Sequence, residues 1–130
     1  KKNFDGSIAE VYATLVPDTR SGTPGADAVK TKGVLTWVAA HDALRAEVRL
    51  YDRLFTEAQP DAAGRDFKTC LNPDSKKVVS AWLEPSLAAA NADQKFQFER
   101  HGYFVADRRD HAADAPVFNR ITALKDGWAK

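Results

Sequence analysis

The sequence predicts an all-β fold: an antiparallel β-barrel, or a pair of barrels, with one or two short helical turns. Three observations carry this prediction. Short β-rich segments, about seven in all, follow one another with turn residues between them. In the clearest of them apolar and polar residues alternate, which is the pattern of a half-buried strand. No segment repeats apolar residues at the 3.6-residue period of a long helix, so a helical fold is not favoured.

The expected strands are short, and proline or glycine marks most of the loops between them. The segment 47–55 alternates most regularly: Val48 and Leu50 share an apolar face, while Glu47 and Arg49 share the opposite face. The strands are expected at residues 8–16, 34–38, 47–55, 76–83, 95–102, 103–107 and 117–124.

Two short helical turns are expected between strands. One lies at 66–71 and is stopped by Asn72 and Pro73. The other lies at 86–90, with Ser86 as its N-cap. The tryptophans are expected in the core because they are large and only three in number: Trp37, Trp82 and Trp128.

Composition excludes several classes of protein. The net charge is only +1, from 19 basic and 18 acidic residues, so a nucleic-acid surface must come from local clustering. Cys70 stands alone, which excludes an internal disulfide and fits a reducing cytoplasm. No apolar run reaches membrane-spanning length. The histidines are scattered at positions 41, 101 and 111 without metal-ligand spacing, so no metal site is expected. The chain has no methionine, and we expect it to be a piece of a longer protein.

The segment 95–104 is the candidate binding element. It alternates as a half-buried strand turning at Gly102, with its phenylalanines facing the core and Gln97 and Glu99 facing out. Arg100 falls on the phenylalanine side, so we expect a bulge near His101 and Gly102 to bring it beside Gln97. Together these two side chains offer the donors and the acceptor needed to read the edge of a nucleobase.

Five groups of residues resemble the carboxy-terminal anticodon-binding region of the bacterial glutaminyl-tRNA synthetase family, in the same order. They are KGVLTWV at 32–38, EVRLYDRLF at 47–55, NPDS at 72–75 with EPSL at 84–87, FQFER at 96–100 with GYF at 102–104, and PVFNR at 116–120 with Asp126 and Trp128. The chain departs from the family at Thr36, Arg45 and Lys125, where His, Pro and Arg are usual.

The resemblance implies a fold and a binding partner. It implies two β-barrels of a type also found in a ribosomal protein, a proximal one nearer the catalytic domain and a distal one farther from it. Residues 1–55 would be the later part of the distal barrel. Residues 56–130 would be the part of the proximal barrel to which the chain returns afterwards. It implies that Gln97 and Arg100 read the middle uracil of the glutamine anticodon, and that Glu99 orients Arg100 by a hydrogen bond. Candidate contacts to the RNA backbone are Arg49, Arg53, Arg120 and Lys125.

The resemblance also implies what the chain does not do. The parent would be a cytoplasmic ligase that joins glutamine to its tRNA through an adenylate, using ATP and magnesium in a catalytic domain outside this chain. No DNA or membrane partner is expected. Because both barrels would lack strands, we expect the chain to hide their open edges by pairing with a second copy, or to be disordered over its first thirty or so positions.

Three alternatives stay open. A glutamyl-tRNA synthetase of related type would carry the same barrels. A free-standing barrel that binds structured RNA would suit the Arg49 and Arg53 stripe, although these arginines equally fit a solvated face paired with Glu47. A small-ligand or carbohydrate-binding barrel would use exposed tryptophans. RNA binding should weaken steeply with salt and sugar binding should not.

Overall fold

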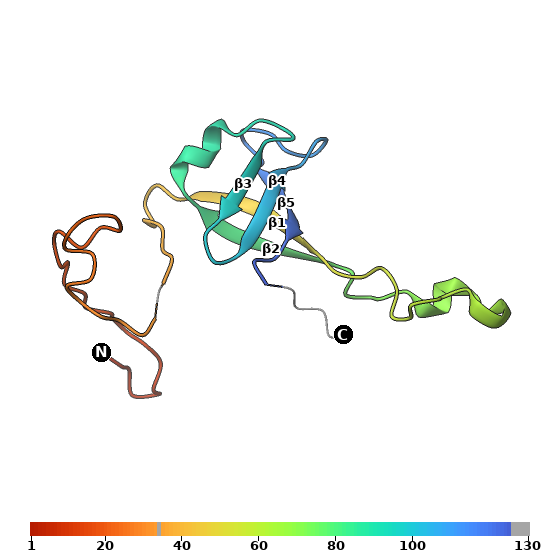
Figure 1. The fold of residues 1–130 in the computed structure, drawn as a ribbon, viewed down its shortest axis with the longest axis horizontal. Helices are drawn as coiled ribbons and strands as arrows, with labels where there is room; N and C mark the ends of the chain where they lie inside the picture. Colours follow the sequence, from red (N-terminus) through yellow and green to blue (C-terminus); the bar gives the residue numbers. More distant parts are fainter. Residues whose placement is uncertain (34, 126–130) are drawn as a thin grey trace. The chain divides into compact units, whose positions relative to one another are not determined.

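The computed structural model describes residues 1–33 and 35–125, and the chain divides into two compact units, Lys1–Leu35 and Thr36–Lys130. The second unit contains a five-stranded sheet in the order β2-β1-β5-β4-β3 (Figure 1). The strands are β1 (Leu44–Tyr51), β2 (Lys76–Leu83), β3 (Lys95–Phe98), β4 (Gly102–Ala106) and β5 (Val117–Thr122). The described helices are 3-10 turns: η1 (Ala62–Gly64), η2 (Phe67–Cys70) and η3 (Pro85–Ala89). The all-β prediction is confirmed.

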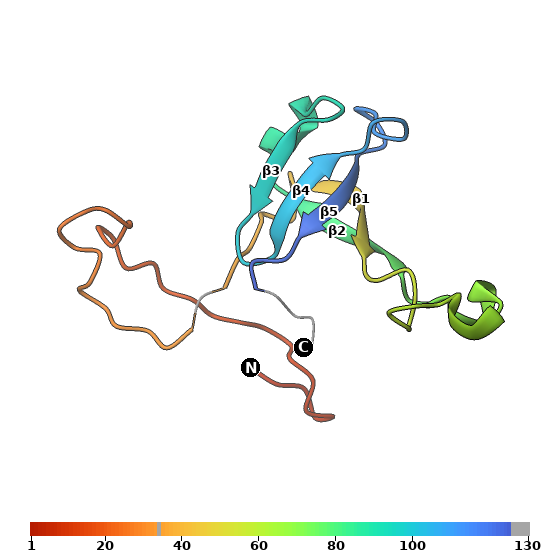
Figure 2. The ribbon, with the colours of Figure 1, turned by 45° about the vertical axis from the view of Figure 1, so that its right-hand side comes forward.

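The sheet mixes two kinds of pairing. β1–β2, β3–β4 and β4–β5 are antiparallel, as Figure 2 shows for the last three strands. β1 and β5 are parallel, with Glu47 opposite Val117, so the prediction of a purely antiparallel sheet is wrong for this pair. Period-two patterning identifies a strand and its faces, but it does not say which strand lies beside it or in which direction.

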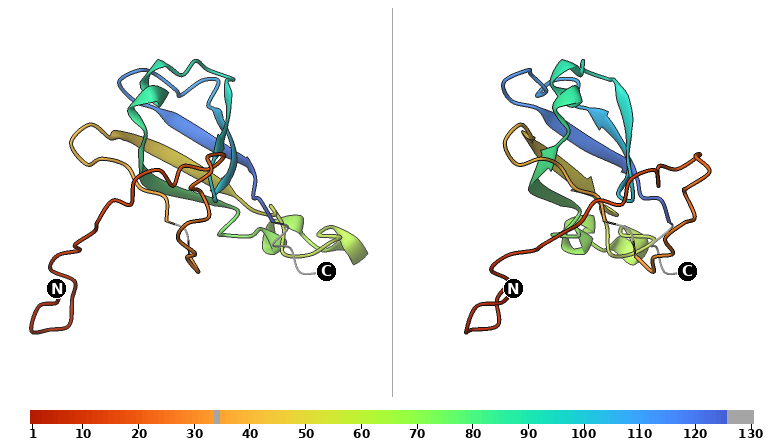
Figure 3. Two further views of the ribbon diagram at one scale, coloured as in Figure 1. Left: turned by 60° about the vertical axis from the view of Figure 1, so that its left-hand side comes forward. Right: turned by 90° about the vertical axis from the view of Figure 1, so that its left-hand side faces the viewer.

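The sheet curves round a shared core (Figure 3). The buried cluster contains residues of the four adjacent strands β2, β1, β5 and β4, so one face of the sheet carries a continuous core. Among the described residues β2 and β3 remain the outer strands and no pairing between them closes the barrel. The buried members of this cluster are Ala46, Val48, Leu83, Phe104, Ala106 and Phe118.

β2 matches its predicted range, and its outer face explains one wrong expectation. Leu83 is buried in the core, so Trp82 beside it points to the opposite face and is 60% exposed. Trp37 is 83% exposed, so neither tryptophan of the described part lies in the core as expected. Trp128 lies outside the described residues.

The loop from β1 to β2 forms a long arm with a small cluster of its own. The strand predicted at 47–55 ends at Tyr51, and beyond it the two sides of the loop are joined by the isolated bridge between Phe55 and Leu71 and by single backbone hydrogen bonds such as that from Asp52 N–H to the Ser75 carbonyl. Phe55 packs edge-on against Phe67 at 6.3 Å between ring centroids. In η2 the side chain of Asp66 accepts a hydrogen bond from the Lys68 amide at 3.0 Å, which confirms the predicted helical turn.

The second predicted turn is present but begins one residue early. η3 starts at Pro85, and Glu84 is its N-cap residue without a side-chain cap bond. Ser86 is therefore not the N-cap, because proline, which lacks an N–H, already occupies the first helical position.

The first unit contains no regular strand among residues 1–33. Lys2 and Ile8 form an isolated bridge, closed by a turn in which Asn3 N–H donates to the Ser7 carbonyl at 2.9 Å. The strand predicted at 8–16 is absent, and its apolar side chains such as Tyr12 are exposed. A β-rich segment is stable as a strand only when a neighbour pairs with its N–H and C=O groups. Residues 35–38 are not a strand either, and Val34 lies outside the described residues.

The division of the chain falls between Leu35 and Thr36 rather than near position 55. β1 precedes position 55, yet it pairs along its whole length with β2, which follows it. The assignment of 1–55 to a distal barrel and of 56–130 to a proximal barrel stays a prediction.

Candidate nucleic-acid interface

The candidate interface is built on the β3–β4 hairpin. Phe96 pairs with Phe104, Gln97 with Tyr103, and Phe98 with Gly102. A three-residue loop at 99–101 connects the strands, and His101 N–H closes it by donating to the Phe98 carbonyl at 3.0 Å. The hairpin therefore ends in a short, hydrogen-bonded tip.

The inner face of the hairpin is anchored by aromatic packing. The ring of Phe98 stacks on the ring of Phe104, with 4.3 Å between their centroids, and meets the ring of Phe118 edge-on, with 5.5 Å between centroids. Phe96 also packs edge-on against Phe118, at 5.8 Å. Because Phe96 and Phe98 both face the core, Gln97 between them must point to the opposite face, as predicted.

Arg100 lies in the loop and not on the strand where it was predicted. Its φ is 67°, in the left-handed region that glycine or asparagine usually occupies. This conformation costs an ordinary side chain about 1–2 kcal/mol. An arginine held there turns away from the phenylalanine face without the bulge that was expected at residues 101–102. Such local strain is found preferentially at binding sites.

Gly102 lets the chain return from this loop. Its φ is 137°, and a Cβ atom there would collide with the Thr122 carbonyl oxygen of β5. The pairing between β4 and β5 is irregular just after Gly102, where the register shifts between Tyr103 and Phe104. The bulge predicted near His101 and Gly102 is therefore wrong, because the β3–β4 pairing is regular and the register shift lies between β4 and β5.

Glu99 and Arg100 are both exposed at the tip. Within the described residues no hydrogen bond or ion pair joins them. The predicted orientation of Arg100 by Glu99 stays a prediction for the bound state.

Arg49 has a different environment from the other candidate RNA contacts. Its guanidinium bonds Glu47 at 2.6 Å, Asp110 at 2.7 Å and Asp107 at 3.3 Å, and its side chain is only 15% exposed. The bond to Glu47, followed by that to Asp110, raises the pKa of Arg49 above its ordinary value. Three carboxylates compete with any phosphate for this side chain, so its local role is to bind the 107–116 loop to β1.

Asp107 is the second member of this polar cluster. Its carboxylate accepts hydrogen bonds from the Asn119 amide, from the backbone N–H groups of Asp110 and Arg109 at 2.8 and 2.9 Å, and from Arg49. These contacts, the Asn119 amide first, lower the pKa of Asp107 from 3.8 to about 2.

The other predicted backbone contacts are spread over the second unit. Arg53 follows β1 and is exposed; its backbone N–H binds the Asp52 carboxylate and its carbonyl accepts from the Asn72 amide. Arg120 is half-buried on β5, opposite Phe104. Lys125 is exposed beyond the end of β5. Gln97, Glu99 and Arg100 thus lie on β3 and in the loop that follows it, whereas Arg53 follows β1 and Arg120 and Lys125 lie on and beyond β5.

Residues 1–33 and 35–125 contain no group of three or more His, Cys, Asp or Glu side chains that could hold a metal ion. No helix there is long and apolar enough to cross a membrane.

The sequence of the hairpin also matches a known family of domains. The model of the class I tRNA synthetase (E and Q) anticodon-binding domain matches residues 34–107, which include β3 and β4. The chain belongs to this anticodon-binding domain family. Residues 108–125, with β5, extend the same sheet beyond the matched range.

Three relatives that are similar to nearly the whole chain are each named glutamine–tRNA ligase. The relative from Ralstonia nicotianae is 60% identical over 129 residues, and the one from Cupriavidus taiwanensis is also 60% identical over 129. The Bordetella avium relative is 56% identical over 128 residues. These matches cover 98–99% of the chain but only 22% of each relative, so the chain spans about a fifth of their length.

Proposed function

We propose that this chain is the anticodon-recognition part of a glutamine–tRNA ligase and that it binds the anticodon loop of the glutamine tRNA. One observation carries the proposal: in a member of an anticodon-binding domain family, Gln97 points outward beside a loop that holds Arg100 in a left-handed conformation. The names of the relatives favour glutamine over glutamate, since the family model itself covers both enzymes.

The chemistry of the two side chains suits a uracil at the middle of the anticodon. The edge of uracil presents two carbonyl oxygens and one N–H between them. The Gln97 amide can accept from that N–H and donate to one carbonyl, and the Arg100 guanidinium can donate to the other. Proteins recognise unstacked RNA bases in this way, by hydrogen bonds to the base edge from a rigid surface.

Contacts to the RNA backbone would supply affinity without sequence preference. Arg53, Arg120 and Lys125 are the candidates for phosphate contacts, and Glu99 would orient Arg100 once RNA is bound. Arg49 is the weakest of the predicted phosphate contacts because its carboxylate partners compete for it. The same competition speaks against a free-standing barrel that grips structured RNA through Arg49.

The chain itself is proposed to be non-catalytic. ATP, magnesium and glutamine would be bound in the part of the parent enzyme that the relatives have beyond this chain. We place the parent in the cytoplasm and expect neither DNA nor a membrane as a partner. A second copy of the chain is a further proposed partner, because β2 and β3 end the sheet with unpaired edges among the described residues.

The test is aminoacylation by a chimera, in which this chain replaces the matching segment of the Ralstonia nicotianae glutamine–tRNA ligase. Arg100→Ala should reduce the preference for uracil over cytosine at the middle anticodon position. A base-edge contact worth about 1–3 kcal/mol corresponds to a loss of about 5- to 150-fold in the ratio of kcat/KM values.

The matched control is Arg108→Ala. Arg108 is also an exposed arginine, paired with Asp93 at 2.9 Å, and it follows β4 at the end away from the 99–101 loop. If Arg100→Ala keeps the same uracil preference as Arg108→Ala and the unmodified chimera, the proposed recognition is wrong.

A further inference from the structure

We propose that Tyr103 is the surface on which the base recognised by Gln97 and Arg100 stacks. This inference rests on the proposed function and assigns it a further residue. Tyr103 was not among the candidate binding residues predicted from the sequence. The alternation of the two strands does place it on the outward face, opposite Gln97.

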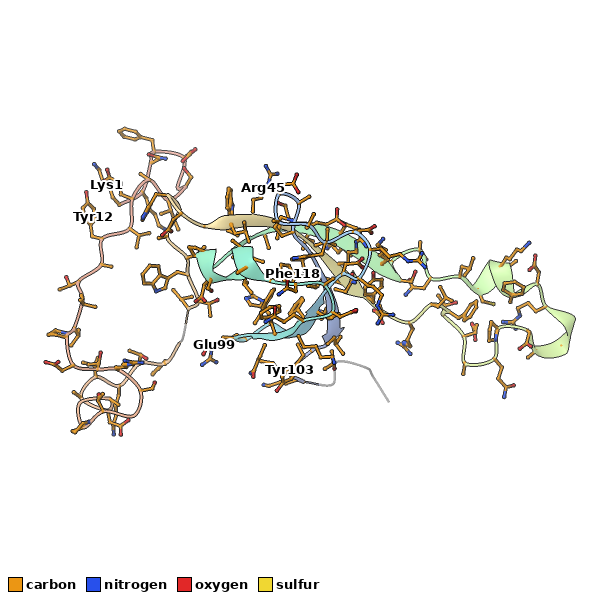
Figure 4. All side chains as sticks on the ribbon, turned by 90° about the horizontal axis from the view of Figure 1, so that it is seen from above. Lys1, Tyr12, Arg45, Glu99, Tyr103 and Phe118 are labelled. Carbon is orange, nitrogen blue, oxygen red and sulfur yellow. The ribbon has the colours of Figure 1, made fainter. Side chains whose placement is uncertain are left out.

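Tyr103 lies on the same face of the sheet as Gln97 and directly beside it. The two residues are paired in the β3–β4 register, so their Cβ atoms lie about 4.5–5.5 Å apart. The next residue, Phe104, is buried in the core, which directs Tyr103 outward, and its side chain is 44% exposed. In Figure 4 Tyr103 lies on the side of the hairpin away from Phe118.

Tyr103 is the exposed tyrosine on a strand of the hairpin. The three phenylalanines of residues 95–106, Phe96, Phe98 and Phe104, pack against the core, and His101 lies in the connecting loop and not on a strand. A base splayed out of a loop must cover its flat face as well as satisfy its edge, and an aromatic ring is the usual partner for that face.

The backbone of Tyr103 is fixed by pairing on both sides. β4 lies between β3 and β5, so Tyr103 has Gln97 on one side and Thr122 on the other. Its hydroxyl has no hydrogen-bond partner among the described residues, whereas the hydroxyl of the equally exposed Tyr51 donates to Asn119 at 3.1 Å. The hydroxyl and the exposed part of the Tyr103 ring are therefore accessible to a ligand.

The surroundings of the ring suit a nucleic acid. Lys95 precedes Gln97 by two positions on the same face of β3, and Arg100 stands at the loop above. Glu99 is the one acidic residue between positions 95 and 106. A stacking ring flanked by cations is the arrangement by which proteins hold single-stranded bases.

Stacking and edge recognition predict different effects of mutation. Every base has a flat face, so loss of the Tyr103 ring should weaken binding of all middle bases alike. Loss of Arg100 should instead change the preference among bases. This difference separates the stacking inference from the recognition proposal.

The experiment uses the chimera and anticodon stem–loop RNAs that carry uracil, cytosine or 2-aminopurine at the middle position. Tyr103→Ile keeps an apolar, β-favouring side chain and removes the ring. We expect it to weaken binding of all three RNAs by about 5- to 150-fold, the range found when stacking residues are removed. Tyr103→Phe should bind within about twofold of the parent, and Tyr51→Ile, a change at an equally exposed tyrosine, should not affect binding.

The fluorescence of 2-aminopurine reports stacking directly. It should fall when the RNA is saturated with the parent chimera or Tyr103→Phe, and fall less with Tyr103→Ile. Tyr103→Trp provides a second test should Tyr103→Ile not fold: its binding should be retained and its tryptophan fluorescence quenched by RNA.

Three outcomes overturn the inference. The first is a Tyr103→Ile protein that binds and quenches like the parent. The second is one that changes only the base preference, which would make Tyr103 an edge reader. The third is a Tyr103→Trp protein that loses binding or shows no quenching. If Arg100→Ala retains its effect in these cases, the stacking inference fails alone; if Arg100→Ala is also silent, the proposed function fails with it.

Discussion

Asp107 offers the sharpest test of how the sheet holds the loop that follows β4. We consider Asp107→Asn. One oxygen of Asp107 accepts from the N–H groups of Arg109 and Asp110, and an asparagine carbonyl can replace it. The other oxygen accepts from the Asn119 amide and Arg49, and there an asparagine would present an NH2 group to two donors.

The magnitude follows from the pKa of Asp107, which is lowered from 3.8 to about 2 in the folded chain. A depressed carboxyl pKa stabilises the fold above the unfolded-state pKa and loses that contribution as the pH falls through the folded-state pKa. A shift of nearly two units corresponds to about 2 kcal/mol, most of which should disappear between about pH 5 and pH 2. At pH 7 the Asp107→Asn chain should therefore be less stable by about 2–3 kcal/mol.

The assay is urea unfolding of the 130-residue chain, followed by circular dichroism at several pH values between 7 and 2. The difference in unfolding free energy between the parent and Asp107→Asn should shrink by about 2 kcal/mol as the pH falls. Asp114→Asn is the matched control, since Asp114 is an exposed carboxylate of the same loop. If the difference in unfolding free energy between the parent and Asp107→Asn stays constant from pH 5 to pH 2, or is absent at pH 7, the stabilising role given to the Asp107 carboxylate is refuted.

Two further predictions concern the hairpin tip and the sheet edges. Arg100→Gly should raise the unfolding free energy by about 1 kcal/mol, because glycine adopts the φ of 67° without strain. The same change should weaken RNA binding. Urea unfolding measures the effect on stability, and a loss of stability would contradict the strain argument. The chain alone should self-associate through its unpaired strand edges at micromolar concentration, and light scattering that shows a clean monomer would refute this.

The sequence predicted those parts of the fold that depend on local patterning. β2 was found with its full range, because alternation in residues 76–83 is bounded by Pro85. The β3–β4 hairpin and the outward position of Gln97 were found for the same reason. The strand expected at 8–16 failed because β-propensity alone does not supply a pairing partner.

The predicted site stays a prediction in its residues, and the structure changes the geometry that was expected for it. Gly102 looked like the turn, so Arg100 was placed on a strand, whereas the structure puts the turn at 99–101 with Arg100 in the left-handed position. No glycine or asparagine marks that position, so the usual turn signal is missing. Arg49 looked like a solvated arginine because Asp107 and Asp110 lie about sixty positions away in the sequence.

The parallel pairing of β1 with β5 has a consequence for how the chain is made. The two strands lie about seventy positions apart, whereas β3 and β4 are joined by three residues. A chain leaving the ribosome can form the β3–β4 hairpin as soon as both strands emerge, but the centre of the sheet must wait for the last strand. Until then the inner faces of β1 and β2 have no cover from β5, and this interval is when the nascent chain is most exposed to aggregation and to chaperones.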